Sequence, residues 1–255
     1  MRSERPLGSY GVDAPWVPWM WIGYAILYTC LAIASVVLWS AWRPITVLLC
    51  VVALASVLGA ALFWYASLRG KFILWEQILR SANVCDRRNA LDLGCGHGMV
   101  AIMTARRAPA MTVVGIDLWR SVDQSGNTPE AAQANARMNG VDDRVRFDTG
   151  DMTALPYESN SFDLITASLA IHNIPSREGR RDAINEAVRV LSDGGTILIA
   201  DIRRTKQYAQ DLRAAGLHVT TQPLGWRGWW SGPWMATTSL SAVKPPAPKR
   251  TRLSA

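Results

Sequence analysis

The first third of the chain is almost uncharged, whereas the rest alternates charged and apolar residues. No Asp, Glu, Lys or Arg occurs from Ala14 to Ala41 or from Pro44 to Leu68. The stretch from Trp19 to Trp42 has about 24 residues, and as a helix it would measure about 36 Å, enough to cross a hydrocarbon core of about 30 Å. A buried core helix rarely lacks charge around its whole circumference for this length. The pattern therefore predicts two transmembrane helices within residues 16–68.

Aromatic and basic residues flank these spans. Indoles stand at both ends of the first span, as expected at the headgroup level of a bilayer: Trp16, Trp19, Trp21, Trp39 and Trp42. Five cations lie outside the pair of spans: Arg2, Arg5, Arg69, Lys71 and Arg80. Arg43 alone lies in the turn between them. The positive-inside bias predicts a multi-pass protein of the cell membrane with both ends of the hairpin, and the rest of the chain, in the cytoplasm.

The remaining segments differ in pattern. Residues 1–15 carry Arg, Pro and Gly and are expected to form a flexible tail. Residues 69–84 place apolar groups at helical spacing and predict an amphipathic connecting helix, lying between membrane and domain or packed on the sheet. Residues 85–243 alternate short apolar strands with helical patterns, which predicts βαβ units in an α/β domain. Residues 244–255 contain three prolines and mostly polar residues, and are expected to be disordered.

Composition and charge narrow the classes of partner. The chain has 255 residues, 49% of them hydrophobic, and a formal net charge of +7. The Lys and Arg residues are scattered, and several flank apolar runs where anionic lipid is the expected counter-charge, so no nucleic-acid partner is predicted. Cys30 and Cys50 lie in apolar runs, and Cys85 and Cys95 lack disulfide-framework or zinc-ligand spacing. No metal site is predicted.

A glycine-rich run follows the first predicted strand of the domain. Gly94, Gly96 and Gly98 lie between the strand-like Leu91-Asp92-Leu93 and the helix-friendly residues 99–103. Glycine lacks a Cβ and tolerates positive φ, so successive backbone N–H groups can face a polar ligand. The dinucleotide fingerprint Gly-x-Gly-x-x-Gly would need glycine at Met99. A nicotinamide oxidoreductase is therefore disfavoured.

Together with Asp92, this Gly-x-Gly-x-Gly run resembles the first motif of the class I S-adenosylmethionine (SAM) dependent methyltransferases. Four further segments resemble the motifs that follow, in the same order: Val113–Asp117, Gly150–Met152, Ser161–Thr166 and Leu191–Asp201. The resemblance covers about residues 85–243. It implies a Rossmann-like, mostly parallel seven-stranded sheet with an antiparallel last strand, and SAM as the cofactor.

The resemblance also implies where the cofactor binds. The glycine run would hold the amino-acid end of SAM, while Asp92 orders this loop or meets the ammonium through water. Asp117 would accept hydrogen bonds from the ribose, Asp151 would accept one from the adenine amino group, and Met152 would pack on the ring or belong to the core. The full implied set is Asp92, Gly94, Cys95, Gly96, Gly98, Asp117, Leu118, Asp151, Met152 and Ser168.

Methyl transfer is a direct displacement that needs alignment rather than a metal or a covalent residue. An oxygen or sulfur nucleophile must still lose a proton, and imidazole titrates near neutral pH. His172, after the fourth strand, is therefore the predicted base, with a structural hydrogen bonder as the alternative. Asp201, at the end of the fifth strand, is the second predicted catalytic residue, with a surface turn as the alternative.

The segment from Leu224 to Trp234 carries four tryptophans among three glycines. We expect it to lie on the same side of the domain as the hairpin, where it contacts lipid or covers an apolar substrate. On this expectation, replacing Trp229 and Trp230 by alanine leaves stability nearly intact.

These patterns predict an integral-membrane SAM-dependent methyltransferase that acts at the cytoplasmic membrane face. Its expected substrate is a lipophilic or amphiphilic small molecule, such as a quinone, an isoprenoid, a lipid or a thiol, and membrane lipid is its expected partner. The alternative is a membrane-anchored SAM-binding sensor or scaffold without catalysis. The sequence leaves the oligomeric state and the acceptor open.

Overall fold

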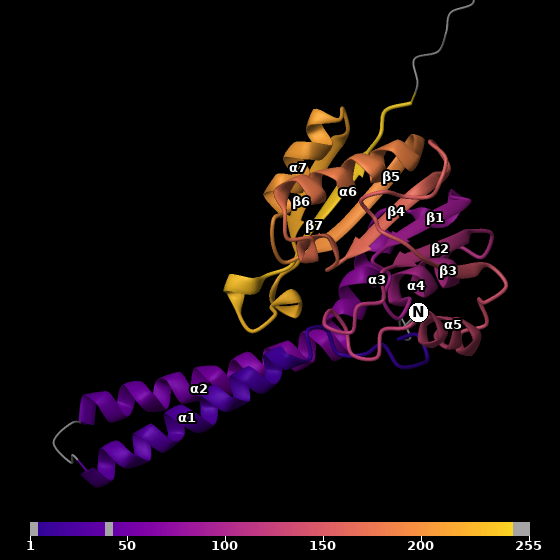
Figure 1. Ribbon diagram of the computed structural model, residues 1–255. Coiled ribbons are helices and arrows are strands. Elements are labelled where there is room, and N and C mark those ends of the chain that lie inside the picture. Colours follow the sequence, from indigo (N-terminus) through magenta and orange to yellow (C-terminus); the bar gives the residue numbers. More distant parts are fainter. Residues whose placement is uncertain (1–4, 39–42, 247–255) are drawn as a thin grey trace, which may run out of the picture.

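The computed structural model describes residues 5–38 and 43–246 (Figure 1). Four features of the sequence predictions lie outside these residues: Arg2, Trp39, Trp42 and residues 247–255 of the C-terminal tail.

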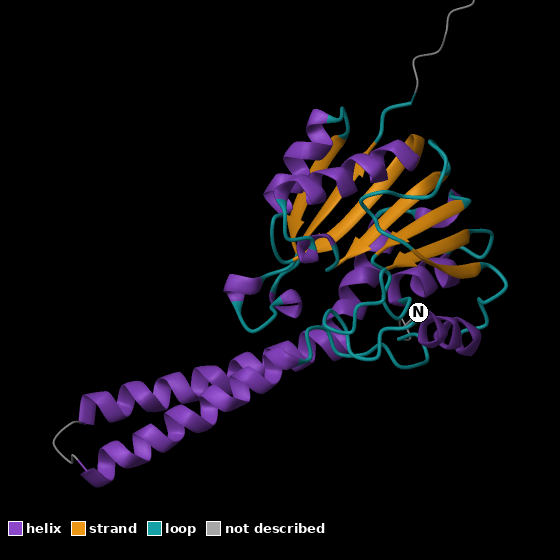
Figure 2. Cartoon of the chain, in the orientation of Figure 1, coloured by secondary structure: helices purple, strands orange, loops and turns teal. Residues whose placement is uncertain are grey.

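Two antiparallel helices, α1 (Trp16–Leu38) and α2 (Arg43–Tyr65), form an arm that extends from the rest of the molecule (Figure 2). Small residues face the seam between them, and a Cβ at Gly59 would come within 3.2 Å of the Trp21 ring. Apolar side chains are exposed along the arm: Ile26, Ile33, Val37, Val47, Leu54 and Leu58. By length and composition, two helices among the described residues are able to cross a membrane, Trp16–Leu38 and the continuous helix Arg43–Ser81.

The helix that begins with α2 continues into the domain. A π-helical turn, η1 (Ala66–Gly70), joins α2 to α3 (Lys71–Ser81). A Cβ at Gly70 would overlap the carbonyl oxygen of Arg227, so glycine permits this close approach. α3 buries Trp75 and Leu79 in the core beneath α4 (Met99–Arg107). It is thus packed on the sheet, which is one of the two positions predicted for an amphipathic helix here.

The domain is a seven-stranded sheet with the order β3-β2-β1-β4-β5-β7-β6. β7 is antiparallel to both of its neighbours, whereas the first five strands pair in parallel. The mostly parallel sheet with an antiparallel last strand is therefore confirmed. The strands are β1 (Asn89–Leu93), β2 (Thr112–Asp117), β3 (Val145–Thr149), β4 (Phe162–Ser168), β5 (Leu191–Asp201), β6 (His218–Pro223) and β7 (Thr238–Val243).

Helices cover both faces of the sheet and make two cores. α3, α4 and α5 (Pro129–Met138) pack on one face, and α6 (Arg177–Val190) and α7 (Thr205–Ala214) pack on the other (Figure 2). The strand order reverses between β1 and β4. In such sheets the crevice at the carboxyl ends of the strands, beside this reversal, is the usual ligand site.

Residues 5–15, which we call the N-terminal strap, differ from the flexible tail that the composition predicted. Tyr10 is 2% exposed, and its ring meets that of Phe72 edge-on at 5.4 Å. Asn135 Nδ2 donates to the carbonyl oxygen of Ser9 at 2.8 Å, and its Oδ1 accepts from the Ser9 N–H at 3.1 Å. One turn later, Asn139 makes the same kind of pair with the backbone of Leu7. Two side-chain amides on one face of α5 thus pair with the backbone N–H and C=O groups of the strap, as a neighbouring β-strand would.

The tryptophan-rich loop between β6 and β7 lies beside the base of the hairpin, on the side that the sequence predicted (Figure 1). Its tryptophans differ from one another. Trp230 is 3% exposed, packs edge-on against Phe63 of α2 at 5.3 Å and donates through Nε1 to Thr237 Oγ1 at 3.1 Å. Trp226 and Trp234 are exposed. Trp230 is therefore a core residue, and its burial argues against the expectation that truncating Trp229 and Trp230 leaves stability nearly intact.

A small apolar cluster joins the hairpin to the domain, and we call it the hairpin-base cluster. Its buried members are Val17, Phe63, Ala66 and Trp230, and its partly buried members include Met20, Trp21, Leu169 and Ile202. The last two residues directly follow β4 and β5. The base of the arm therefore touches the ends of two central strands.

Candidate active site

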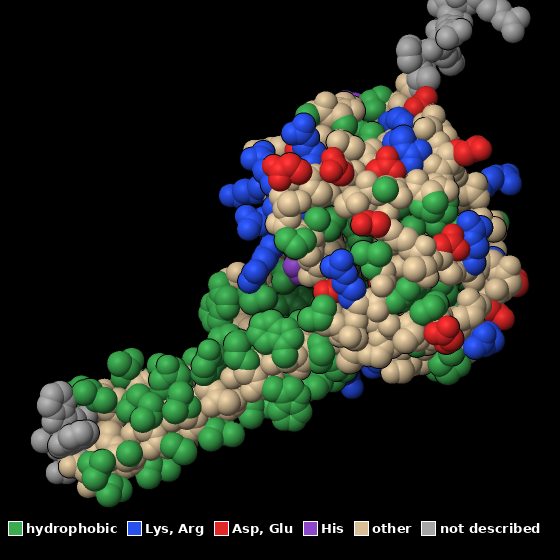
Figure 3. Space-filling model, viewed as in Figure 1, with side chains coloured by type: hydrophobic (Ala, Val, Ile, Leu, Met, Phe, Trp, Pro, Cys, Tyr) green, Lys and Arg blue, Asp and Glu red, His purple; other side chains and the backbone are tan. Residues whose placement is uncertain are grey.

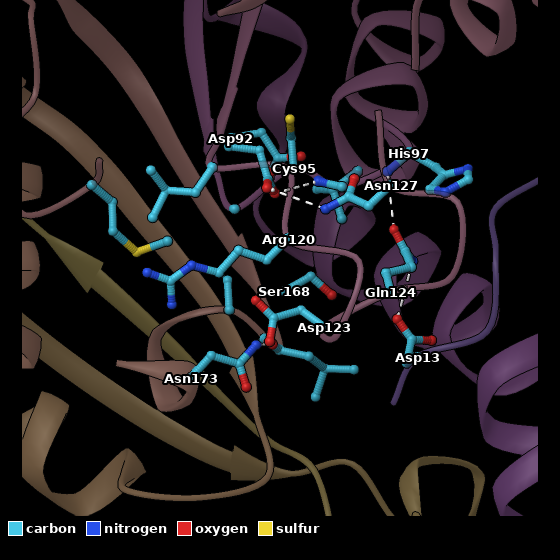
Figure 4. Close-up of a pocket in the computed structure, with 18 of the residues that line it drawn as sticks. Asp13, Asp92, Cys95, His97, Arg120, Asp123, Gln124, Asn127, Ser168 and Asn173 are labelled. Carbon is cyan, nitrogen blue, oxygen red and sulfur yellow. Dashed lines mark hydrogen bonds between the residues drawn. The ribbon is translucent and has the colours of Figure 1, made fainter. Parts of the chain in front are cut away.

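A cavity of about 280 Å³ lies at the carboxyl ends of the central strands (Figure 4). Nine of the ten residues predicted to hold the cofactor line it: Asp92, Gly94, Cys95, Gly96, Asp117, Leu118, Asp151, Met152 and Ser168. Gly98 does not. It precedes α4 with φ of 76°, and a Cβ there would press on the Phe147 ring. Gly98 thus supports the loop on the side away from the cavity, where it packs against Phe147.

The carboxylate of Asp117 fixes the glycine loop. Its Oδ2 accepts from the Gly96 N–H at 2.8 Å, and its Oδ1 accepts from the Trp119 N–H at 2.7 Å and from Asn127 Nδ2 at 3.2 Å. The side chain stands at the cavity wall, where the resemblance expects a ribose acceptor.

We expect Asp117→Ala to weaken SAM binding by about 1.5–3 kcal/mol, the range for hydrogen bonds to a charged group. Titration calorimetry measures this. Asp163→Ala is the matched control, because that carboxylate also accepts backbone N–H groups, from Arg88 and Asn89, but at the opposite ends of the strands. Equal affinity of the Asp117 variant and the control would remove Asp117 from the cofactor site.

Asp92 lies behind the loop and is 1% exposed. Its Oδ1 accepts from Thr166 Oγ1 at 2.7 Å, and its Oδ2 accepts from the Ala101 N–H in α4 at 3.2 Å. Burial raises the pKa of this carboxyl to about 7, and the nearby Asp117 charge adds to the rise. The geometry matches the loop-ordering role among the two roles that the resemblance implied.

This raised pKa makes stability depend on pH. The folded state favours the protonated carboxyl, so the stability that protonation contributes is complete below about pH 4 and is lost as the pH rises to about 7. The Asp92→Asn variant has no such titration. We expect its free energy of unfolding, relative to that of the unsubstituted chain, to rise by about 2–3 kcal/mol between pH 5 and pH 8. Any fixed cost of the amide beside Ala101 cancels in this difference. Denaturant melts at the two pH values provide the comparison, and parallel pH profiles would contradict it.

The cavity offers partners for the polar groups of SAM. Asn127 is 5% exposed, and its Oδ1 has no hydrogen-bond partner in the described structure, so a buried acceptor faces this space. Asp117 and Asp151 are further acceptors, and Arg120 is a cation at the rim. At Gly94 a Cβ would overlap Ala170, and at Gly96 it would overlap Gln124, so the backbone itself forms the floor. These groups suit ammonium, hydroxyl and amino donors together with a carboxylate.

The N-terminal strap closes one side of the cavity (Figure 4). Asp13 accepts from Lys71 Nζ at 2.7 Å and from Gln124 Nε2 at 3.2 Å. The same glutamine accepts from the His97 N–H in the glycine loop at 3.1 Å, and the His97 ring lies 2.8 Å from the carbonyl oxygen of Ser9. Strap, hairpin end and glycine loop are thus one polar network. The sequence reasoning missed Asp13, Lys71 and Gln124, since no motif marks them.

The two predicted catalytic residues lie together beside the cavity. His172 Nδ1 is 2.7 Å from Asp201 Oδ1. Asp201 is fully buried rather than part of a surface turn, and it also accepts from the Ile202 N–H at 2.7 Å. Neither residue lines the cavity, but Leu169, Ala170 and Asn173 around His172 do. His172 Nδ1 and Asp201 Oδ1 lie at ion-pair distance, although their alignment is not that of a hydrogen bond.

Leu169 links this pair to the hairpin. It follows β4 with φ of 53°, a left-handed conformation that is uncommon outside glycine. Its side chain packs in the hairpin-base cluster, and the residue also lines the cavity. Such conformations often mark functional sites. Among the described residues, no three His, Cys, Asp or Glu side chains converge as metal ligands.

Comparison with known proteins gives matches over the same region. A family model described as a methyltransferase domain matches residues 90–195. Methyltransferase GfsG from Streptomyces halstedii is 38% identical over 127 residues, 50% of this chain and 42% of that protein. The ubiquinone/menaquinone biosynthesis C-methyltransferase UbiE from Dinoroseobacter shibae is 35% identical over 111 residues, 44% of this chain and 41% of that protein. The match therefore spans less than half the length of each relative.

Solved structures share the fold. That of the cyclase SpnF superposes with a TM-score of 0.58 at 23% identity, covering 69% of this chain and 81% of its own. Identity at this level carries information about architecture alone, so the reaction has to be argued from the site.

Proposed function

We propose that this chain, which carries a class I SAM-dependent methyltransferase domain, transfers a methyl group from SAM to a lipophilic or amphiphilic small molecule at the cytoplasmic face of a membrane. One observation above all supports this function. The residues that follow β4 and β5, Leu169 and Ile202, pack in the hairpin-base cluster, so the acceptor side of the site adjoins the base of an apolar arm. An acceptor dissolved in the bilayer would have a short path to His172.

The residues around the cavity divide the work of holding the cofactor. The glycine loop receives the amino-acid end of SAM, Asp117 the ribose, and Asp151 with Met152 the adenine. Arg120 is the cation available to the carboxylate at the rim. When bound, SAM supplies an electrophilic methyl group on a sulfonium. The protein then needs to align the acceptor and exclude water.

His172 is the proposed general base. Its Nε2 takes the proton of an oxygen or sulfur nucleophile as the methyl group is transferred. Asp201 lies beside the other ring nitrogen and would stabilise the imidazolium that forms. This pair beside the cavity, with Asp201 fully buried and His172 partly buried, favours catalysis over a sensor or scaffold that only binds SAM.

Three arguments support a membrane location and an apolar acceptor. The arm exposes apolar side chains over most of its length, and exposed apolar surface of this extent is unfavourable in water. Trp226 and Trp234 are exposed near its base, as suits a headgroup layer. The relative named for quinone methylation shares 35% identity over the matched segment. Quinones, isoprenoids, lipids and small thiols all remain in the proposed class.

The test is methyl transfer from radiolabelled SAM by the full chain in membranes, followed by phase separation of the products. We expect label in the organic phase and release of S-adenosylhomocysteine. Label confined to the aqueous phase would overturn the lipophilic acceptor, and SAM binding without any turnover would favour a sensor.

The topology is tested with the exposed cysteine of the domain. Cys85 is exposed and lies after the hairpin. In a variant that retains only this cysteine, we expect an impermeant maleimide to label Cys85 after permeabilisation but not in intact cells, because the domain is proposed to face the cytoplasm. Labelling from outside the intact cell would reverse the topology.

A further inference from the structure

A concave basic surface lies next to the His172–Asp201 pair. It encloses about 580 Å³ and is formed by the start of α6 and by the segment from Ile202 into α7. Five cations surround it, and we call this group the basic basin: Arg177, Arg180, Arg203, Arg204 and Lys206. The proposed mechanism uses none of them.

The cations of the basin are not paired directly with carboxylates: within the described residues, none of the five forms an ion pair. Arg180 is 5% exposed and donates only to neutral acceptors, the carbonyl oxygens of Ile174 and Pro175 at 2.7 and 2.9 Å and Gln207 Oε1 at 3.3 Å. A buried guanidinium among further cations is unfavourable unless an anion joins it.

The backbone adds to this preference for an anion. Arg204 is the N-cap of α7, has φ of 59° and makes no side-chain hydrogen bond to the helix. No N-cap side chain bonds to the first-turn N–H groups of this ten-residue helix, which carry partial positive charge, and the first-turn residues Thr205, Lys206 and Gln207 line the basin. Arginine forks suit the oxygens of phosphate in particular.

The basin is also continuous with the apolar contact to the arm. Ile202 lines the basin and packs in the hairpin-base cluster. Figure 3 shows Lys and Arg side chains gathered on the flank of the domain above the apolar base of the arm. A molecule with a phosphate and an apolar chain would fit both surfaces at once, with Asp201 one residue away from the contact.

We propose that the basic basin binds the phosphate group of an amphiphile whose apolar part lies along the hairpin-base cluster. This site deepens the function proposed above and rests on it for the membrane setting. The phosphate belongs either to the methyl acceptor, as a terminal monoester, or to a bilayer lipid, as a headgroup diester. A phosphate monoester carries more negative charge and more free oxygens than a diester, so binding of one probe of each kind distinguishes the two sources.

Binding is measured on the full chain without turnover, so a failed methylation assay leaves this test intact. In micelles of an uncharged detergent, we expect dodecyl phosphate to bind at least about tenfold more tightly than dodecanol. The double variant Arg203→Glu with Arg204→Glu should lose that advantage. Arg88→Glu with Arg137→Glu is the control, because it makes the same change in net charge on exposed cations outside the basin.

Each outcome is decisive. Preference for dodecyl phosphate over dioleoylphosphatidylglycerol in nanodiscs assigns the phosphate to the acceptor, and equal or reversed preference assigns it to a lipid headgroup. If the basin variant loses no more affinity for either probe than the control variant, the basin is not a phosphate site. Binding of an RNA oligonucleotide with higher affinity than either probe would replace the amphiphile with a nucleic acid.

Discussion

Replacing His172 by alanine is expected to lower kcat by about 10²–10⁴-fold, the usual contribution of a general base, while SAM affinity stays the same. The reason is geometric. Asp201 is buried and its Oδ1 lies 2.7 Å from Nδ1, so a carboxylate stands beside one ring nitrogen, and the ring itself lies outside the cofactor cavity. Single-turnover kinetics with labelled SAM, together with calorimetry, separate the two quantities.

Two further variants sharpen this result. Asp201→Asn keeps the shape but presents an amide to Nδ1, and it should also lower kcat, because the imidazolium is no longer stabilised. His218→Ala removes a histidine from the exposed face of β6 and serves as the control. If His172→Ala and His218→Ala methylate at the same rate, His172 is not a general base. A carbon nucleophile that is already activated, for example, needs no base.

Replacing Trp230 by alanine should cost about 3–5 kcal/mol of stability, the range for truncating a buried aromatic residue. The indole fills the contact between the loop and α2, where Phe63 packs edge-on against it. Its Nε1 hydrogen bond to Thr237 would also be lost, leaving a buried hydroxyl with one partner fewer. Thermal unfolding in detergent micelles or nanodiscs measures the change.

Trp234→Ala is the matched control, because that ring is 67% exposed in the same loop. It should change stability by less than about 0.5 kcal/mol, as surface substitutions do. Similar stabilities of the two variants would show that the loop does not join the domain to the arm. The comparison tests the sequence-based expectation that truncating Trp229 and Trp230 leaves stability nearly intact.

The sheet could be predicted because its signals are local. The central strands are short apolar runs, and the turns at their carboxyl ends carry glycine or aspartate, so the family resemblance could place Asp92, Asp117 and Asp151 at this edge of the sheet. The antiparallel last strand followed from the resemblance, and the register of β7 against β5 agrees with it. The two apolar spans were equally evident from the absence of charge.

The polar network over the cavity could not be predicted, since its partners are distant in sequence and chemically ordinary. The sequence places Asp13 in a predicted flexible tail, whereas in the structure it bonds to Lys71 and Gln124. As polar residues of a predicted helix, Asn135 and Asn139 would be expected to face solvent. In the structure their amides bind the strap. His172 and Asp201 were each predicted, but their pairing depends on two neighbouring strand ends and not on sequence spacing. No sequence pattern indicated that Arg180 is buried.

The N-terminal strap has a consequence for the order in which the protein is made. Residues 5–15 leave the ribosome before their partners His97 and Asn135, which lie 88 and 126 residues beyond Ser9 in the glycine loop and α5. Helices α1 and α2 are synthesised in between. The strap therefore cannot make its contact with α5 until synthesis has passed Asn135. Closing this side of the cavity depends on contacts between residues far apart in the sequence, whose loop-closure entropy makes them costly to form.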